Sequence, residues 1–158
     1  MTNRPKDIGT RGESQVVGFL REHGFPNSER RALRGTKDVG DITGTPGIVW
    51  EVKAGEAART ASDNQVDLWL AETDLERDND GAQLGLLVMA RRRHNVRTWW
   101  AVMHADDLVG LLSDGAHGTS QRVPVRMTLQ NAVRLLRDNG YGEPVDYGQL
   151  AEGHYEDD

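Results

Sequence analysis

Residues 39–55 (VGDITGTPGIVWEVKAG) carry the clearest strand pattern in the chain. Ile48, Trp50 and Val52 alternate with other residues, and such alternation is typical of a strand with one face in the core. The TGTPG sequence before them has the glycine and proline residues of a tight turn. The segment therefore predicts two antiparallel strands around a turn centred on Pro46.

Helix and strand patterns alternate along the rest of the chain. Helices are expected over residues 11–23, 62–77, 105–112 and 129–138. Strands are expected over residues 83–92, 96–104 and 123–127, with a further short strand within the arginine-rich segment 28–37. This order predicts an α/β fold in which helices flank a mixed β-sheet. The length of 158 residues fits a single domain.

The formal net charge of −6 is unevenly distributed. Residues 138–158 contain seven acidic residues and no lysine or arginine, which leaves 19 basic and 18 acidic residues in the rest of the chain. Binding to nucleic acid is therefore open despite the overall charge. We expect residues 138–158 to form an acidic, mobile C-terminal tail. A second acidic run, residues 67–80, is expected to be a solvated helix face and loop.

The chain has no cysteine, which excludes disulfides, thiolate metal sites and cysteine nucleophiles. It has no apolar stretch long enough to span a membrane and no secretory signal at its start. A cytoplasmic protein that does not bind membranes is the simplest expectation. The tryptophans are expected mainly in the core, but one of Trp99 and Trp100 must face away from it if their segment is a strand.

The residues best suited to catalysis cluster in the predicted hairpin. In a strand, residues two positions apart share a face, so Glu51 and Lys53 point away from the core. A turn centred on Pro46 places Asp41 directly opposite Glu51, with Cβ atoms about 4.5–5.5 Å apart. Two carboxylates that close repel each other unless a cation lies between them. The register predicts a two-carboxylate site with a lysine beside it, on the solvent face of the hairpin.

Such a site suits Mg²⁺, which binds through a few carboxylate oxygens and retains waters and positions for a substrate phosphate. Mn²⁺ is expected to substitute for it. The matching chemistry is metal-assisted phosphodiester hydrolysis, with Lys53 holding the attacking water or offsetting charge in the transition state. Glu13, on the first helix, is the candidate for a further metal ligand. The structural alternative is a Glu51–Lys53 surface ion pair and a Glu13 that compensates the helix dipole.

Two groups of basic residues border these elements, one before the hairpin and one after the predicted strand at 83–92. Their members are Arg30, Arg31, Arg34 and Lys37 in the first group and Arg91, Arg92 and Arg93 in the second. Contacts from such side chains to phosphates supply most of the salt-dependent affinity for a nucleic acid. Both groups are candidates for binding a DNA backbone, with a solvated loop or a charged turn as the alternative.

Together, Gly12-Glu13, Gly40-Asp41-Ile42 and Glu51-Val52-Lys53 resemble the motifs of the PD-(D/E)XK nuclease superfamily. The small size and the glutamate of the first helix resemble its Holliday junction resolvase branch, of archaeal and phage type. Residues 23–53 are also similar to small nucleases encoded by phages of actinobacteria. The resemblance covers residues 9–70, and Gly40 stands where the family usually has proline.

This resemblance implies a restriction-endonuclease-like fold over residues 1–137 and a Mg²⁺-dependent DNA endonuclease. The residues it implies are Glu13, Asp41, Glu51 and the carbonyl of Val52 for the metal, and Glu13, Asp41, Glu51, Lys53 and Gln65 for catalysis. The expected substrate is a four-way (Holliday) DNA junction, cut by a homodimer because two symmetric cuts need two active sites. The alternatives are a nuclease that acts on linear duplexes, flaps or replication and packaging intermediates, and a non-catalytic DNA-binding protein with the same fold.

Overall fold

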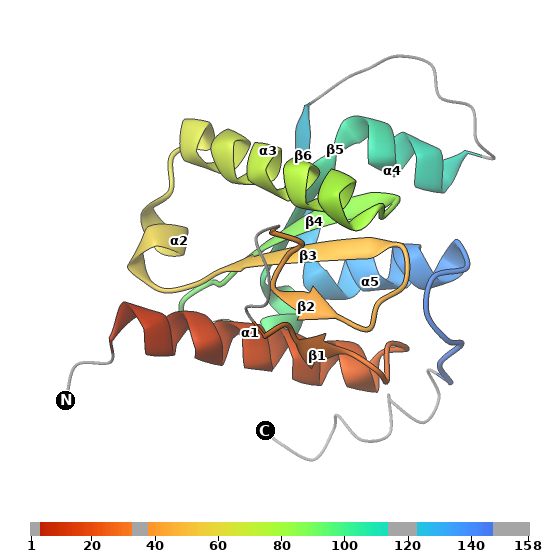
Figure 1. The fold of residues 1–158 in the computed structure, drawn as a ribbon, viewed down its shortest axis with the longest axis horizontal. Coiled ribbons are helices and arrows are strands. Elements are labelled where there is room, and N and C mark those ends of the chain that lie inside the picture. The colour runs from red at the N-terminus through yellow and green to blue at the C-terminus, as the bar shows by residue number, and fades with distance from the viewer. Residues whose placement is uncertain (1–3, 33–37, 114–122, 147–158) are drawn as a thin grey trace.

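A four-stranded mixed sheet forms the centre of the structure, with helices on both of its faces (Figure 1). The computed structural model describes residues 4–32, 38–113 and 123–146. In spatial order the strands are β3 (Ile48–Lys53), β4 (Leu84–Met89), β5 (Trp100–His104) and β6 (Pro124–Thr128). β3 and β4 are parallel, and the other two pairs are antiparallel. The expected α/β fold with a mixed sheet flanked by helices is confirmed.

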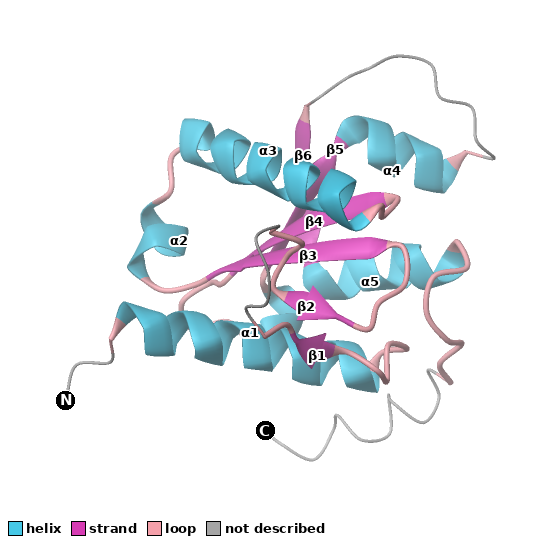
Figure 2. Ribbon diagram, viewed as in Figure 1, coloured by secondary structure: helices cyan, strands magenta, loops and turns pink. Residues whose placement is uncertain are grey.

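The helices divide the apolar side chains between the two faces of the sheet (Figure 2). α1 (Pro5–Glu22) and α5 (Leu129–Asp138) pack on one face, and α3 (Asp63–Asp80) packs on the other. Two shorter helices, α2 (Glu56–Thr60) and α4 (Ala105–Leu112), follow β3 and β5. In the part of the chain that the structure describes, every helix is too short or too polar to cross a membrane.

Alternation along β3 sends its side chains to both packed faces. Ile48, Trp50 and Val52 join the core under α1 and α5, whereas Glu51 and Lys53 lie on the face that α3 covers. The turn before β3 is held by Thr45, whose hydroxyl accepts from the Trp50 indole Nε1 at 3.1 Å and donates to the Ile48 carbonyl at 3.1 Å. The turn and the strand are therefore one locally bonded unit.

Several elements differ from the sequence prediction. α1 begins at Pro5, earlier than the predicted 11, because proline at the first helical position needs no backbone donor. The predicted strand at 96–104 begins only at Trp100, since Val96–Thr98 form a 3₁₀ turn that Asn95 caps through the amide of Arg97. The prediction that the two strands around the Pro46 turn pair with each other is wrong. β2 (Ile42–Thr43) pairs instead with β1 (Glu29–Arg30) in a separate two-stranded sheet, because the chain turns away from β3 after the bond from the Asp41 amide to the Trp50 carbonyl.

The chain beyond α5 continues along the body of the domain. The Tyr141 amide donates to the Leu136 carbonyl at 3.0 Å, and the Glu143 amide donates to the Gly24 carbonyl at 2.7 Å. These contacts tie the beginning of the expected acidic tail to the end of α1 and to α5. Residues 147–158 of that tail lie outside the described residues.

Candidate active site

Glu51 and Lys53 lie side by side on β3, and α3 covers them. The Lys53 Nζ atom is 2.8 Å from Glu51 Oε1 and 3.8 Å from Glu72 Oε2, and it lies 5.6 Å from the centre of the Trp69 ring. Glu51 is only 8% exposed, so the expectation that this pair lies on the solvent face is wrong for Glu51. The reason is that α3 packs on this face of the sheet through Trp69 and its apolar neighbours.

The charge of Lys53 is stabilised by the acids around it. Burial alone would lower the pKa of its ammonium group, but the hydrogen bond to Glu51 and the charges of Glu51, Glu72 and Asp41 outweigh burial, so the pKa is raised. Lys53 is therefore a fixed positive charge at neutral pH. It can neutralise an anion, and it cannot serve as a base.

Asp41 is next to Glu51 because the chain from β2 returns along β3. The Asp41 amide donates to the Trp50 carbonyl at 2.8 Å, and Asp41 Oδ2 accepts a hydrogen bond from the Val52 amide at 2.8 Å. The contact is local, because β2 pairs with β1 and not with β3 in a continuous ladder. Burial and the charge of Glu51 raise the pKa of Asp41 to about 7, although the Val52 N–H and Lys53 act in the opposite direction.

The glycine at position 40 has a structural cause. Gly40 has a φ of +90°, which proline cannot adopt because its ring holds φ near −65°. A Cβ atom at this position would lie 2.8 Å from Val49 Cγ1 and 2.9 Å from the Trp50 carbonyl oxygen. The close approach of Gly40 to β3 is what brings the Asp41 side chain beside Glu51.

Glu13 of α1 lies near the carboxylate cluster that Asp41 and Glu51 form. A Cβ atom on Gly12 would lie 2.8 Å from Ala54 Cβ, so glycine allows the helix to approach the end of β3 closely. Glu13 Oε2 accepts a hydrogen bond from Arg30 Nε at 2.9 Å. The charge of Glu13 contributes to the raised pKa of Asp41, after burial and Glu51. The acid is thus within electrostatic range of the Asp41–Glu51 pair.

A fourth carboxyl group, Glu76 of α3, completes the cluster and was missed from the sequence. Glu76 is 3% exposed, and its Oε2 atom has no hydrogen-bond partner among the described residues. Burial, then the charges of Glu51 and Asp38, a hydrogen bond with Glu51 and the charge of Asp41 raise the pKa of Glu76 to about 9. Its carboxyl group is therefore neutral at pH 7 and donates to Glu51.

Helical periodicity was the signal that could have identified Glu76. Val66, Trp69, Leu70 and Thr73 form the buried stripe of α3, and Glu76 continues it three residues further on. The expectation that the acidic run 67–80 is a solvated face is wrong for Glu76. It is also wrong for Asp74 of the same run, which is buried. Asp74 Oδ2 forms a hydrogen bond of 2.7 Å with His104 Nε2.

The two remaining residues implied by the resemblance are placed less directly. Gln65 lies in the first turn of α3, where its amide donates to the Ser62 hydroxyl at 3.2 Å. Val52 is between Glu51 and Lys53, and its amide is the donor to Asp41. Neither residue has a further polar contact with the carboxylate cluster among the described residues.

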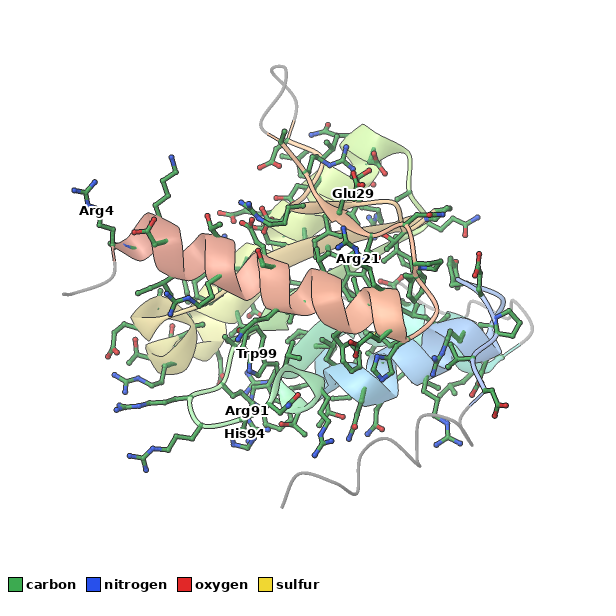
Figure 3. The ribbon with its side chains drawn as sticks, turned by 90° about the horizontal axis from the view of Figure 1, so that it is seen from below. Arg4, Arg21, Glu29, Arg91, His94 and Trp99 are labelled. Carbon is green, nitrogen blue, oxygen red and sulfur yellow. The ribbon has the colours of Figure 1, made fainter. Side chains whose placement is uncertain are left out.

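The two basic groups differ in their partners. Arg30 is paired with Glu13, and Arg31 Nη2 is 3.7 Å from Asp80 Oδ1. Arg91 lies on the loop after β4, and Figure 3 shows it with His94 on the opposite side of that view from Glu29 of β1. The Ala90 amide donates to the Lys53 carbonyl, which joins this loop to the carboxyl end of β3. Arg34 and Lys37 lie outside the described residues.

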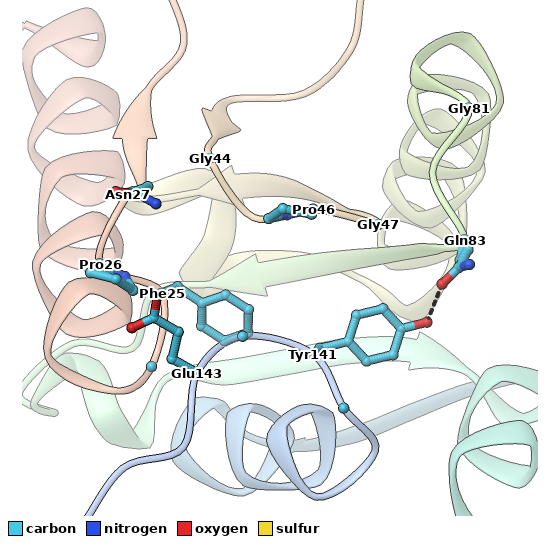
Figure 4. Close-up of a pocket in the computed structure, with 13 residues that line it drawn as sticks. Phe25, Pro26, Asn27, Gly44, Pro46, Gly47, Gly81, Gln83, Tyr141 and Glu143 are labelled. Atoms are coloured by element: carbon cyan, nitrogen blue, oxygen red, sulfur yellow. Dashed lines mark hydrogen bonds between the residues drawn. The ribbon is translucent and has the colours of Figure 1, made fainter.

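A pocket of about 560 Å³ lies at the opposite end of β3, beside the turn at residues 44–47 (Figure 4). Phe25 and Tyr141 form part of its wall, and the Tyr141 hydroxyl donates to Gln83 Oε1 at 2.6 Å. None of the predicted site residues lines it. The pocket is therefore separate from the carboxylate cluster.

The carboxylates present fit Mg²⁺ as a site of two carboxylate ligands. Among the described residues, no three histidine, aspartate or glutamate side chains are close enough to bind one metal ion together. Mg²⁺ is often held by one or two carboxylates, with waters and a substrate phosphate as its other ligands. The Asp41–Glu51 pair meets that requirement, and the buried, unpartnered Oε2 of Glu76 adds an oxygen without a donor nearby.

Comparisons of the chain with known protein families, with curated proteins and with solved structures found no match.

Proposed function

We propose that this chain is a Mg²⁺-dependent DNA endonuclease of the PD-(D/E)XK type with a restriction-endonuclease-like fold. The observation that carries the proposal is the Lys53 ammonium group 2.8 Å from Glu51 Oε1, with Asp41 close enough to Glu51 for that charge to raise its pKa. Clustered acids repel one another and so raise one another's pKa values, and a bound divalent cation removes that repulsion. The order of α1, strands β2 and β3, α3 and the parallel strand β4 supports the same assignment.

In this proposal Asp41 and Glu51 hold the metal, with the Val52 carbonyl beside them. Glu13 would become a further ligand only by moving closer, because in the structure no three acidic side chains of the described residues are near enough to bind one ion together. The bound ion would supply charge neutralisation at the scissile phosphate and a lowered pKa for the attacking water. Lys53 contributes a permanent positive charge where negative charge develops on the phosphorus oxygens. Because its ammonium group keeps its proton, Lys53 orients the water and does not deprotonate it.

The substrate we propose is a four-way DNA junction, cut by a homodimer to leave 5′ phosphates. Two cuts related by two-fold symmetry need two active sites, one from each copy of the chain. A nuclease that acts on linear duplexes, flaps or replication and packaging intermediates would use the same site. A non-catalytic DNA-binding protein would keep the basic surfaces and bind no metal.

The test is cleavage of labelled four-way junction, linear duplex, flap and single-stranded DNA with Mg²⁺ or Mn²⁺. We expect the junction to be cut in preference to its linear arms. Asp41→Asn and Lys53→Ala should abolish cleavage while DNA binding survives. Asp67→Asn, an exposed change on α3, is the matched control and should leave cleavage unchanged.

The substrate panel separates the proposed activities. Cleavage of duplex or flap DNA in preference to the junction would retain the nuclease and change its substrate. If the wild-type protein cuts none of these DNAs and calorimetry detects no binding of either ion, the nuclease proposal is wrong.

A further inference from the structure

Two arginines lie over the ring of Trp100 at the start of β5. The Arg91 guanidinium lies 3.9 Å from the centre of the Trp100 ring, and the Arg126 guanidinium of β6 lies 5.5 Å from it. Trp99 is 6% exposed in the core on the other face, so Trp100 is the one of the pair that faces away from α1. The three side chains form one cationic unit, which we call the Trp100 platform.

The sheet register places this platform in the same rows as the candidate catalytic residues. Lys53 is opposite Met89, and Met89 is opposite Trp100. Paired residues of a sheet point to the same face, so Trp100 and Lys53 share the face that α3 covers in part. Trp100 is two strands from Lys53, a separation of about 10 Å at about 4.8 Å per strand. Arg126 pairs with Val102 one strand further out.

Among the described residues, the arginines of the platform differ from Arg30, Arg31 and Lys53 in forming no ion pair with a carboxylate. Arg30, Arg31 and Lys53 each have a carboxylate at 3.7 Å or less, which neutralises much of their positive charge. Within the described ranges, no carboxylate is within ion-pair distance of Arg91 or Arg126. Arg92 and Arg93, which follow Arg91, are exposed and also form no ion pair there. Two guanidinium groups that share one aromatic ring and have no carboxylate counterion among the described residues attract an anion.

The geometry selects a phosphate as that anion. A guanidinium group that stacks on an aromatic ring keeps its N–H donors at its edge, where they match the oxygens of a phosphate. Arg91 uses one donor on the Thr98 carbonyl at 3.0 Å, which fixes its orientation and leaves the others available. Arg91 covers one face of the Trp100 ring, so a nucleobase cannot stack on that face.

We propose that Arg91 and Arg126, positioned by Trp100, clamp the phosphodiester backbone of DNA beside Trp100, which is about 10 Å from Lys53. This inference rests on the proposed nuclease function, because it assigns the path of the DNA strand across the site. It also adds Arg126 and Trp100 to the contacts that the sequence indicated. Arg30, bound to Glu13, then belongs to the carboxylate cluster more than to the DNA surface.

The experiment measures DNA binding without cleavage. Wild-type protein in EDTA is titrated into fluorescein-labelled four-way junction and linear duplex, with anisotropy recorded at several salt concentrations. Loss of one phosphate contact removes about 0.9 from the slope of log K against log salt, which is about eightfold in affinity at 0.1 M salt. We therefore expect Arg126→Gln to bind about eightfold more weakly, and the Arg91→Gln/Arg126→Gln double variant to lose about 1.8 of the slope.

Control variants separate the effect of losing positive charge at the Trp100 platform from the effect of losing positive charge elsewhere on the protein. Arg134→Gln removes the same charge from an exposed position on α5, which packs on the other face of the sheet, and should bind DNA as the wild type does. Arg126→Lys keeps the charge and should keep the salt slope. A mononucleotide at millimolar concentration should fail to displace the DNA, and displacement would mean a small-molecule phosphate site instead.

The outcomes for the clamp and for the nuclease are distinguishable. If Arg126→Gln binds DNA as tightly as the wild type, with an unchanged salt slope, the clamp is wrong even when the wild type cuts DNA. If the expected losses occur in EDTA and the protein cuts no DNA with Mg²⁺ or Mn²⁺, the clamp stands and the nuclease proposal fails. Equal losses in Arg134→Gln and Arg126→Gln would also overturn the clamp.

Discussion

Replacing Glu76 by glutamine should stabilise the metal-free protein at neutral pH. In the unfolded chain this carboxyl group is ionised at pH 7, whereas in the folded protein its pKa is raised to about 9 and it holds a proton. Folding at pH 7 therefore requires Glu76 to take up a proton, although pH 7 is about 2.5 units above the ordinary pKa of a glutamate. At about 1.4 kcal/mol per pH unit, this protonation lowers the stability of the folded protein by about 3 kcal/mol. Glutamine is neutral, has nearly the same shape and can still donate to Glu51.

The expected gain is smaller than the full cost because the cluster shares its charge. Asp41, with a pKa of about 7, can take up part of the proton population instead of Glu76. We expect Glu76→Gln to raise the free energy of unfolding by about 2 kcal/mol at pH 7. For a chain of this length that corresponds to an increase of about 4–8 °C in the melting temperature.

The sign of the pH dependence is part of the prediction. Since the pKa of Glu76 is higher in the folded protein than in the unfolded chain, its effect on wild-type stability is nil at low pH and grows more unfavourable as pH rises from about 4.5 towards 9. Thermal melts in EDTA, followed by circular dichroism from pH 5 to 9, should show the two proteins converging at the acid end and separating above it.

Glu72→Gln is the matched control on the same helix. Its side chain is 59% exposed and reaches Lys53 only at 3.8 Å, so we expect a change within about 0.5 kcal/mol. A Glu76→Gln protein that is less stable than the wild type at pH 7, or whose gain is the same at pH 5 and pH 9, would refute the reasoning. Glu76 would then be an ionised acid with favourable contacts.

Two further predictions concern Gly40 and Asp41, which precede the turn before β3. Gly40→Ala should lower the free energy of unfolding by about 1–3 kcal/mol in urea denaturation, because it combines a φ of +90° with a Cβ in contact with Val49. The control Gly18→Ala, in an exposed helical position with nothing within 4 Å of the added Cβ, should instead raise the free energy of unfolding by about 0.5–1 kcal/mol. Equal effects of the two substitutions would contradict the structural role of Gly40. The affinity for Mn²⁺, measured by calorimetry, should fall about tenfold for each pH unit below about 7, because Asp41 must lose its proton to bind a cation. An affinity that does not change from pH 5.5 to 8.5 would exclude Asp41 as a ligand.

The local part of the candidate site could be predicted from the sequence. The alternation along β3 put Glu51 and Lys53 on one face, and the turn at residues 43–47 returned Asp41 to the neighbourhood of Glu51. Both inferences use contacts between residues close in sequence, for which strand periodicity and turn chemistry suffice. The mixed sheet followed from the same kind of pattern.

The parts that depend on packing between distant segments could not be predicted in this way. Glu51 is buried because α3 crosses over β3, and Glu76 enters the cluster only through that packing. Trp100 and Arg126 meet through the pairing of β5 with β6, and no local pattern specifies that register. The early start of α1 at Pro5 was missed because its first turn is polar and has no apolar periodicity.

The turn segment that joins Asp41 to Glu51 has a consequence for the order of folding. Its contacts, from Trp50 to Thr45 and from Asp41 to Trp50, close short loops at a small cost in chain entropy. The parallel pairing of β3 with β4 must wait for the whole intervening segment to double back. We therefore expect the two acids to come together early in folding while still in water, and to lose that water when α3 docks over them.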